Sequence, residues 1–283
     1  MQNLDYLQQL HYQYQGFLAG QDINQTSSSK HYLPFMVQKK SSPTMDTLKQ
    51  WAQQISPKLV LGKRVEHFMS YYLSSQSPFK ILAQNVQIFE QKTTIGELDF
   101  LLEHQTNKTL IHLEQVYKFY LYVPNSKKKS IDNWIGPNCK DRFQQKINKL
   151  HQKQFPLLYH PNTQKTFHDL NLDYSKIQQQ LSFKAALFVP LNWTKGSFSS
   201  INHNCIEGHW LRFEDWKKMP LLKHQFYLPQ KQNWGVFPSA NTTWYSYEVI
   251  ESQILTALSQ KRSPLCWMKI GEDQYRKFFV VWW

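Results

Sequence analysis

Glycine, cysteine and long apolar runs are scarce in this chain, and each scarcity excludes a class of protein. Only nine of the 283 residues are glycine, so glycine-rich loops that cradle nucleotide phosphates are not expected. The three cysteines are odd in number and irregularly spaced, which predicts no disulfide framework and favours a reducing cytoplasm. No apolar run reaches the ~18 residues that a membrane span requires, and the polar N-terminus lacks a signal-peptide pattern. The sequence therefore predicts a cytoplasmic protein without a membrane partner.

Negative charge is also in short supply. Lys and Arg outnumber Asp and Glu by 33 to 20, which gives a formal net charge of +13 and a pI near 9.5. Such a surplus favours a polyanionic partner, with nucleic acid first and an anionic membrane surface second. The alternative is that the charge only aids solubility. We expect nucleic acid as the partner, with DNA preferred.

Apolar and aromatic residues, by contrast, are plentiful. Hydrophobic residues make up 41% of the chain and aromatic residues 15%, including ten Trp. This composition supports a packed core and argues against disorder. The length suits one large domain, or a core with an elaborated end.

Hydrophobic periodicity and turn residues predict an α/β fold. A helix is expected to begin at Ser56-Pro57, because Ser can cap a first turn and Pro fits the first helical position. Three apolar runs follow, and the second and third are expected to pair as an antiparallel hairpin. In chain order we expect a helix over 4–18, a polar loop over 20–43, a helix from 56, strands over 80–89, 94–103 and 109–122, a helix over 140–155, a strand over 184–190, strand-like pieces at 209–213, 266–270 and 277–283, and a helix near 247–260.

Two acids in the middle of apolar strands carry the chemical signal. Asp99 stands in Leu-Asp-Phe-Leu-Leu, and Glu114 follows Leu-Ile-His-Leu. Carboxylates almost never sit in such runs without a paired charge, a hydrogen-bond network or a metal. Lys118 follows the second acid, and Glu66 lies at the margin of the apolar stripe of the preceding helix. A metal-assisted attack on a phosphodiester needs such a set, whereas the structural alternative is a buried salt-bridge network with Lys118, Arg142 or His112.

A basic stripe follows on the helix expected over 140–155. Its members recur at helical spacing, separate from the apolar stripe of the same helix. A solvated face is the ordinary interpretation of such a pattern, but the position directly after the acid-bearing strands favours contacts with phosphates. The expected nucleic-acid-binding residues are Arg142, Lys146, Lys149 and Lys153.

In these features the chain resembles the PD-(D/E)XK nuclease superfamily, whose core has the order helix, three strands, helix, strand. Within it, the wording is similar to that of an uncharacterised bacterial domain-of-unknown-function family. The resemblance implies a restriction-endonuclease-like core over 56–190, with a helical N-terminal extension over 1–55 and a mixed α/β C-terminal extension over 191–283. The likeness rests on Leu61-Gly62…Glu66, Gly96-Glu97-Leu98-Asp99-Phe100, His112-Leu113-Glu114…Lys118-Phe119-Tyr120 and Trp134-Ile135-Gly136-Pro137-Asn138…Asp141-Arg142.

The resemblance also implies roles for individual residues. Asp99 and Glu114 would ligate Mg²⁺ or Mn²⁺, with the carbonyl of Gln115 as a third ligand, and Glu66 would add a ligand or hold a metal-bound water. Lys118 would orient or deprotonate the attacking water, or neutralise charge on the phosphate. The expected function is Mg²⁺-dependent hydrolysis of phosphodiester bonds in DNA.

The position of the lysine departs from the superfamily pattern. The pattern places Lys two residues after the acid, where this chain has Val116. Lys118 shares a strand face with Glu114, but about 13 Å separates their Cα atoms at ideal strand rise. A bulge or a Lys side chain leaning back would close that gap, Lys146 would take over the role, or the role has been lost. In the last case the protein would bind nucleic acid without cutting it, or serve a larger complex through the Trp-rich residues 191–283.

Overall fold

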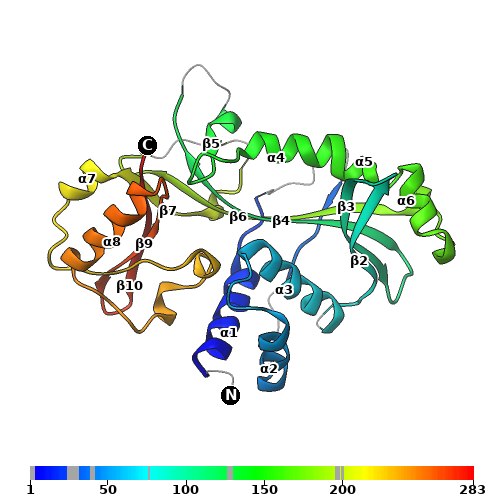
Figure 1. Cartoon of the computed structure of the whole chain (residues 1–283), viewed down its shortest axis with the longest axis horizontal. Helices are drawn as coiled ribbons and strands as arrows, with labels where there is room; N and C mark the ends of the chain where they lie inside the picture. Colours follow the sequence, from blue (N-terminus) through cyan, green and yellow to red (C-terminus); the bar gives the residue numbers. More distant parts are fainter. Residues whose placement is uncertain are drawn as a thin grey trace.

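The computed structural model describes residues 4–23, 32–38, 42–75, 77–125, 130–194, 198 and 201–283. One ten-stranded sheet crosses the whole molecule (Figure 1). Its main path runs in the order β2 (Phe79–Glu90), β3 (Thr93–His104), β4 (Leu110–Tyr122), β6 (Gln178–Pro190), β7 (Ile206–Arg212), β10 (Gln274–Val281), β9 (Leu265–Gly271) and β8 (Gln225–Tyr227). The short strands β1 (Leu33–Pro34) and β5 (Trp134–Ile135) pair with β6 and β4.

The direction of strand pairing changes in the middle of the sheet. The β2–β3 and β3–β4 pairs are antiparallel, as expected for consecutive hairpins. The β4–β6, β6–β7 and β7–β10 pairs are parallel, so each needs a crossover that lies over a sheet face. The connection between β4 and β6 carries the helix expected over 140–155, and it brings that helix onto the acid-bearing strands.

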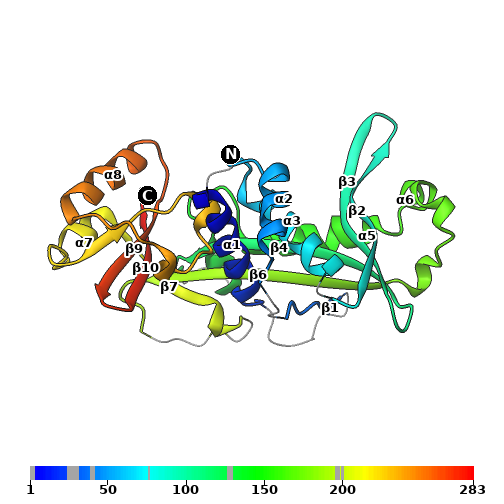
Figure 2. The same cartoon turned by 90° about the horizontal axis from the view of Figure 1, so that it is seen from below.

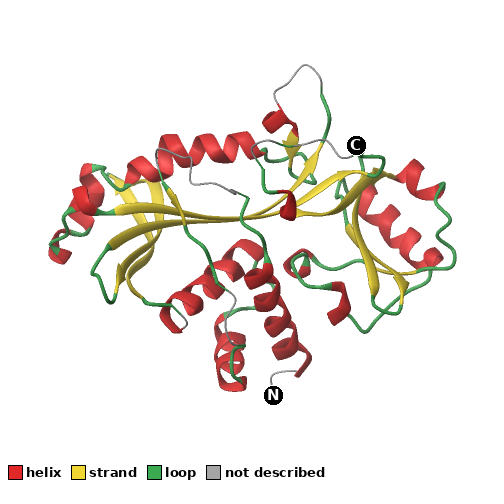
Figure 3. Ribbon diagram, turned by 180° about the vertical axis from the view of Figure 1, so that it is seen from behind, coloured by secondary structure: helices red, strands yellow, loops and turns green. Residues whose placement is uncertain are grey.

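Helices cover both faces of the sheet. On one face lie α1 (Leu4–Ala19), α2 (Met45–Gln54) and α3 (Leu61–Ser75), and α4 (Phe143–Lys149) runs along the other (Figures 1 and 3). The alternation along β4 explains this layering, because Leu113, Phe119 and Leu121 pack towards α1–α3 while Val116 and Tyr120 pack towards α4. The remaining helices are a π-helical turn η2 (Leu150–Gln154), α5 (Phe155–Leu157), α6 (Pro161–Thr166), α7 (Phe213–Lys217) and α8 (Tyr247–Ser259), with 3₁₀ turns at Ser130–Asn133, His168–Leu170, Tyr174–Lys176, His203–Cys205, Lys231–Asn233 and Pro238–Ala240.

The hairpin of β2 and β3 projects beyond the body of the sheet (Figure 2). Beside it, β3 leaves β4: their ladder runs from Glu103–Leu110 to Phe100–Leu113 and ends there, while β2 and β3 remain paired as far as Glu90–Thr93. Because β4 continues in register with β6 from Ile111 to Leu121, the sheet opens at this point. The open end is where Asp99 and Glu114 stand.

Arg64, a fully buried cation on α3, ties the N-terminal helices to the sheet. Its guanidinium donates to the carbonyls of Ser56, Pro57 and Leu59 at 2.8 Å, and to the Gln13 side-chain oxygen at 3.0 Å. These acceptors are uncharged, and together with the Tyr6 hydroxyl they take up all three guanidinium nitrogens. A buried charge is tolerated only with such complete hydrogen bonding.

The α/β architecture is confirmed, and from α3 to β6 the longer elements follow as helix, three strands, helix and strand, with the short strand β5 between β4 and α4. The start of the first core helix was predicted wrongly: Pro57 lies in a turn and α3 begins at Leu61, because the carbonyls of the Ser56–Leu59 segment are used by Arg64. Part of the polar loop expected over 20–43 forms β1 against β6, and residues 24–31 and 39–41 lie outside the described chain. The aromatic pieces of 191–283 are strands that continue the same sheet through the parallel β6–β7 pair. Among the described residues, no helix is long and apolar enough to cross a membrane.

Candidate functional site

Asp99 and Glu114 come together where β3 and β4 diverge. One residue beyond the last ladder pair, the Asp99 carboxylate accepts the backbone N–H of Gln115 at 2.8 Å. Glu114 is fully buried and faces the α4 side of the sheet. The geometry therefore unites the two acids that the sequence singled out.

Two neutral donors hold the Glu114 carboxylate. His112 Nε2 lies 3.0 Å from Oε1, and the Gln154 side-chain amide donates to Oε2. Burial lowers the pKa of His112 to about 4, so the imidazole is neutral. Its Nδ1 faces the Gln179 amide at 3.3 Å, which assigns the proton to Nε2 and makes His112 a donor to Glu114.

Burial is the main influence on the pKa of both acids. Burial, followed by the neighbouring Glu114 charge, raises the pKa of Asp99 to about 7. Burial also raises the pKa of Glu114, and the charge of Lys146 offsets part of that increase. Two buried carboxylates of this kind resist being ionised together, so a cation placed beside them would relieve the repulsion.

Lys146 is connected to the acid pair through Gln154. Its ammonium donates to the Gln154 side-chain oxygen at 2.7 Å, and the same amide donates to Glu114. Burial lowers the pKa of Lys146, while the charges of Glu114 and Asp99 act against that shift. Gln154 thus joins the lysine and the carboxylate in one chain of hydrogen bonds.

The π-helical turn explains how Gln154 reaches the site. Helix α4 ends at Lys149, and the next turn, Leu150–Gln154, takes up the wider π register. A π-turn rotates the side chains that follow it relative to a continuous α-helix, and such turns occur frequently at functional sites. Here it presents Gln154 to Glu114 while Lys149 and Lys153 line the adjoining cavity.

A cavity of about 480 Å³ adjoins the acid pair. Asp99 and Glu97 lie on its β3 wall, and Lys149, Lys153 and Gln154 on its helical wall. Gly96 permits β3 to approach the helical wall closely, since a Cβ there would lie 2.5 Å from Leu157 Cδ2. Of the four predicted phosphate-binding residues, the structure brings Lys146, Lys149 and Lys153 to the acids. Arg142 stands at the N-terminal end of α4, in a bridge with Ile135.

Lys118 does not join the acid pair. Its ammonium lies 2.7 Å from Asp141 Oδ2, and both side chains are about 40% exposed. Val116, which occupies the superfamily lysine position, is buried against α4. Strand rise carries Lys118 too far along β4, so Lys146 is the lysine that the structure places with Glu114.

Glu66 is engaged in a surface ion pair. Lys63 lies 2.8 Å from Glu66 and 3.5 Å from Glu97, bridging α3 to β3. The Glu66 charge still contributes to raising the pKa of Asp99. Within the described ranges, no group of three or more His, Cys, Asp or Glu side chains is arranged to hold a metal ion. Of the three acids expected as ligands, Asp99 and Glu114 lie together on adjoining strands, while Glu66 pairs with Lys63.

The donor chemistry of that pair fits a hard divalent cation with few protein ligands. Mg²⁺ retains several waters and takes one or two carboxylates from the protein. Asp99 and Glu114 supply that number from adjoining strands, and burial keeps their pKa values raised although Lys146 lies nearby. Asp99 and Glu114 would ligate the ion, and Glu66 would join them only on leaving Lys63.

The sequence pointed to His112 as an alternative partner of the acids, but it did not reveal Gln154 and Gln179, which complete the hydrogen-bond network. His112 had a readable signal, because residues two apart on a strand share a face with each other. Gln154 had none, since its approach depends on a π-turn that helical periodicity does not reveal. Gln179 contacts both His112 and the Phe155 carbonyl, and it enters through parallel pairing between distant strands.

Comparison with known proteins gives the family but no activity. Neither the curated proteins nor the solved structures contain a match to the chain. The model of the family described as "Domain of unknown function (DUF1853)" matches residues 8–281. The match spans all three predicted segments, so the chain belongs to the DUF1853 family.

Proposed function

We propose that this protein is a divalent-cation-dependent nuclease that hydrolyses phosphodiester bonds of DNA. One observation carries the proposal: the fully buried carboxylate of Glu114 and the half-buried carboxylate of Asp99 meet beside a cavity that two lysines line. A buried acid pair with raised pKa values in a cleft is typical of functional sites. The likeness to the PD-(D/E)XK superfamily in motif order supports the same activity.

In this proposal each side chain has a separate task. A divalent cation held by Asp99 and Glu114 would supply positive charge against the negative charge that develops on the phosphate. Lys146 neutralises charge on a phosphate oxygen and donates a hydrogen bond to it. Gln154 links the Lys146 ammonium to the Glu114 carboxylate by two hydrogen bonds.

Lys149 and Lys153 would bind the phosphates that flank the scissile one. Both are exposed, and both line the cavity that contains Asp99. Lysine contacts to phosphates position a nucleic acid without reading its sequence. A net charge of +13 adds long-range attraction for a polyanion.

Cleavage and metal binding together test this function. The purified protein is incubated with single- and double-stranded DNA and RNA in Mg²⁺ or Mn²⁺, and Mn²⁺ binding is measured by calorimetry. We expect metal-dependent cleavage of DNA, and loss of both cleavage and Mn²⁺ binding in Asp99→Ala. Glu103→Ala, at an acid of the same strand paired with Lys108, is the matched control. The proposal fails if the protein cuts no nucleic acid and Asp99→Ala leaves Mn²⁺ binding unchanged.

A second candidate is a protein that binds DNA without cutting it. It is favoured by the pairing of Lys118 with Asp141, which removes the expected lysine from the acids. This candidate predicts DNA binding that weakens steeply with salt and does not depend on a divalent cation. A protein partner for residues 191–283 stays a prediction; Leu222, 76% exposed, is the most exposed large apolar side chain there.

A further inference from the structure

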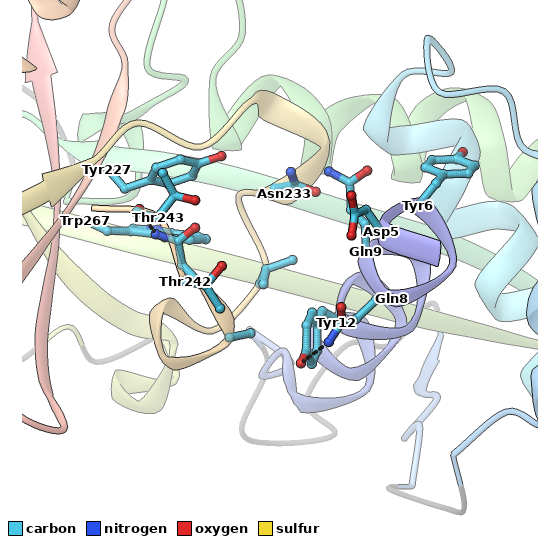
Figure 4. Close-up of a pocket in the computed structure, with 13 residues that line it drawn as sticks. Asp5, Tyr6, Gln8, Gln9, Tyr12, Tyr227, Asn233, Thr242, Thr243 and Trp267 are labelled. Carbon is cyan, nitrogen blue, oxygen red and sulfur yellow. Dashed lines mark hydrogen bonds between the residues drawn. The ribbon is translucent and has the colours of Figure 1, made fainter. Parts of the chain in front are cut away.

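A second cavity lies between α1 and the C-terminal part of the chain, away from the acid pair. It encloses about 520 Å³ and is walled by α1 on one side and by residues of the 227–243 segment and β9 on the other (Figure 4). Pockets that bind small molecules commonly enclose about 300–1,000 Å³. The volume is therefore sufficient for a ligand of one or two rings.

Buried contacts fix the two walls to each other. Gln13 of α1 donates to the Asn233 side-chain oxygen at 2.6 Å, and its own oxygen accepts from Arg64. Next to this bond, Gly16 packs so closely that a Cβ would lie within van der Waals overlap of the Gly235 carbonyl. The cavity is consequently pre-formed and does not require a loop to close.

The cavity is nearly uncharged, although the chain carries +13. Of the 13 residues that line it, all within the described chain, Asp5 alone has a charged side chain. With no Lys or Arg among these 13 residues, and with the Asp5 carboxylate in the first turn of α1, the lining disfavours a phosphate. A ligand of this cavity is therefore neutral, or carries its charge outside.

Aromatic rings and side-chain amides make up much of the lining. Tyr12 stands on the α1 wall, and Tyr227 and Trp267 on the opposite wall, with 5.6 Å between the ring centroids of the latter two (Figure 4). Gln8, Gln9 and Asn241 also line it. An amide presents a donor beside an acceptor, which matches the edge of a nucleobase, and aromatic side chains stack on its face.

The buried indole ring of Trp267 forms part of the cavity wall. It is 2% exposed, and its indole N–H has no hydrogen-bond partner among the described residues. Of the buried polar atoms in that condition, it is the one whose residue lines this cavity. A buried donor without an acceptor costs free energy, and the ring that carries it forms part of the wall against which a ligand would pack.

We propose that this cavity binds an unpaired nucleobase, as a nucleoside or as a base of single-stranded nucleic acid whose phosphates stay outside. Stacking on the tyrosine and tryptophan rings supplies affinity, and Gln9 and Asn241 read the edge of the base. The site does not depend on the acid pair, and it needs no divalent cation. It goes beyond the proposed nuclease activity and stands without it.

Titration of the full chain with adenosine, guanosine, cytidine and thymidine in EDTA tests the site, with tryptophan fluorescence and calorimetry as readouts. We expect saturable binding of at least one nucleoside with a Kd of about 1 mM or below. The 5′-monophosphate of that nucleoside is expected to bind no tighter, because the lining offers no cation. Ribose alone is expected not to bind.

Two variants and a matched control locate the binding. Gln9→Ala, on an accessible face of α1, should weaken nucleoside binding about tenfold, and Tyr227→Leu by at least as much. Gln53→Ala, the same change at an exposed position of α2, should leave nucleoside binding unchanged. The inference is overturned if no nucleoside binds, if ribose binds as tightly as the nucleoside, or if Gln9→Ala and Gln53→Ala behave alike. These results hold whether or not the protein cuts DNA.

Discussion

The two cavities of this protein have nearly the same volume and opposite chemistry. The one beside Asp99 encloses about 480 Å³ and gathers acids and lysines, whereas the one beside Trp267 encloses about 520 Å³ and offers amides, hydroxyls and aromatic rings. Size therefore does not distinguish them, and the lining does. Under the two proposals, phosphate chemistry belongs to the cavity beside β3, and recognition of an uncharged ring belongs to the cavity between α1 and β9.

Burial of charge is what separates the two regions energetically. Asp99 and Glu114 hold raised pKa values because the site buries two acids together. The neutral cavity contains the exposed carboxylate of Asp5 and no buried ion. Changes at the first cavity should therefore respond to metal, pH and salt, and changes at the second should not.

The largest effect is expected from removing the charge of an acid. Asp99→Asn should reduce metal-dependent DNA cleavage by about a hundredfold or more, because one carboxylate ligand and its charge are lost. Nucleoside binding in EDTA should stay at the wild-type value in the same variant. Loss of nucleoside binding together with cleavage would break the comparison, since it would join the two cavities into one site.

Two lysine variants test which lysine acts with the acid pair. Lys146→Met should lower kcat by about tenfold to a hundredfold, because the cation that faces the acids is removed. Lys118→Met should change kcat little, since that ammonium pairs with Asp141. Single-turnover cleavage rates of the two variants decide the matter. The reverse order of effects would restore Lys118 to the role that the superfamily pattern gives it.

A pH series measures the burial of the acid pair without reference to activity. The pKa of Asp99 is raised to about 7, against about 3.9 in an unfolded chain. Its contribution to stability is therefore complete below pH 4 and is lost as the pH rises through 7. We expect Asp99→Asn to be more stable than wild type at pH 8.5 by on the order of 2 kcal/mol, and equal to it near pH 4.

Chemical denaturation in EDTA at several pH values checks this expectation. Glu103→Gln, on the same strand and beside exposed Lys108, should show no such pH-dependent gain. A stability difference that is the same at both ends of the pH range would mean that the Asp99 carboxylate is not held against ionisation.

The smallest effects are expected at the lysines of the cavity wall. Lys149→Ala and Lys153→Ala should each weaken DNA binding a few-fold and reduce the slope of log Kd against log salt by about 1. Lys223→Ala, at an exposed lysine of the C-terminal part, is the control for general charge. Equal slopes for all three variants would show that DNA contacts are spread over the whole basic surface.

The elements that the sequence predicts well are those with a local pattern. Apolar runs broken by Asp99 and Glu114 identified both acids, and helical spacing identified Lys146, Lys149 and Lys153 as one stripe. The pairing of β7 with β10 could not be predicted, because it joins segments that are more than 60 residues apart. The partner of Lys118 is Asp141, which follows after a loop, so proximity to Glu114 in the sequence pointed to the wrong neighbour. Lys63, by contrast, precedes Glu66 by three residues on the same helix.

The sequence did not reveal the surroundings of Gln154 at the candidate site or of Arg64 in the core. Gln154 reaches Glu114 through a π-turn, a register that periodicity does not contain. Arg64 reads as an ordinary surface residue of an amphipathic helix, yet it is completely buried. Most of its acceptors are backbone carbonyls, which no sequence pattern reveals.

The contacts of Arg64 also bear on how this chain can be divided. One run of hydrogen bonds leads from Arg64 to Gln13 and from Gln13 to Asn233. It crosses both boundaries, near residues 55 and 190, at which the sequence suggests separate pieces. A fragment that begins after residue 55 would leave a guanidinium in the core without Gln13 and Tyr6. Fragments cut at either boundary are therefore expected to be less stable than a chain that keeps the span of the family match, residues 8–281.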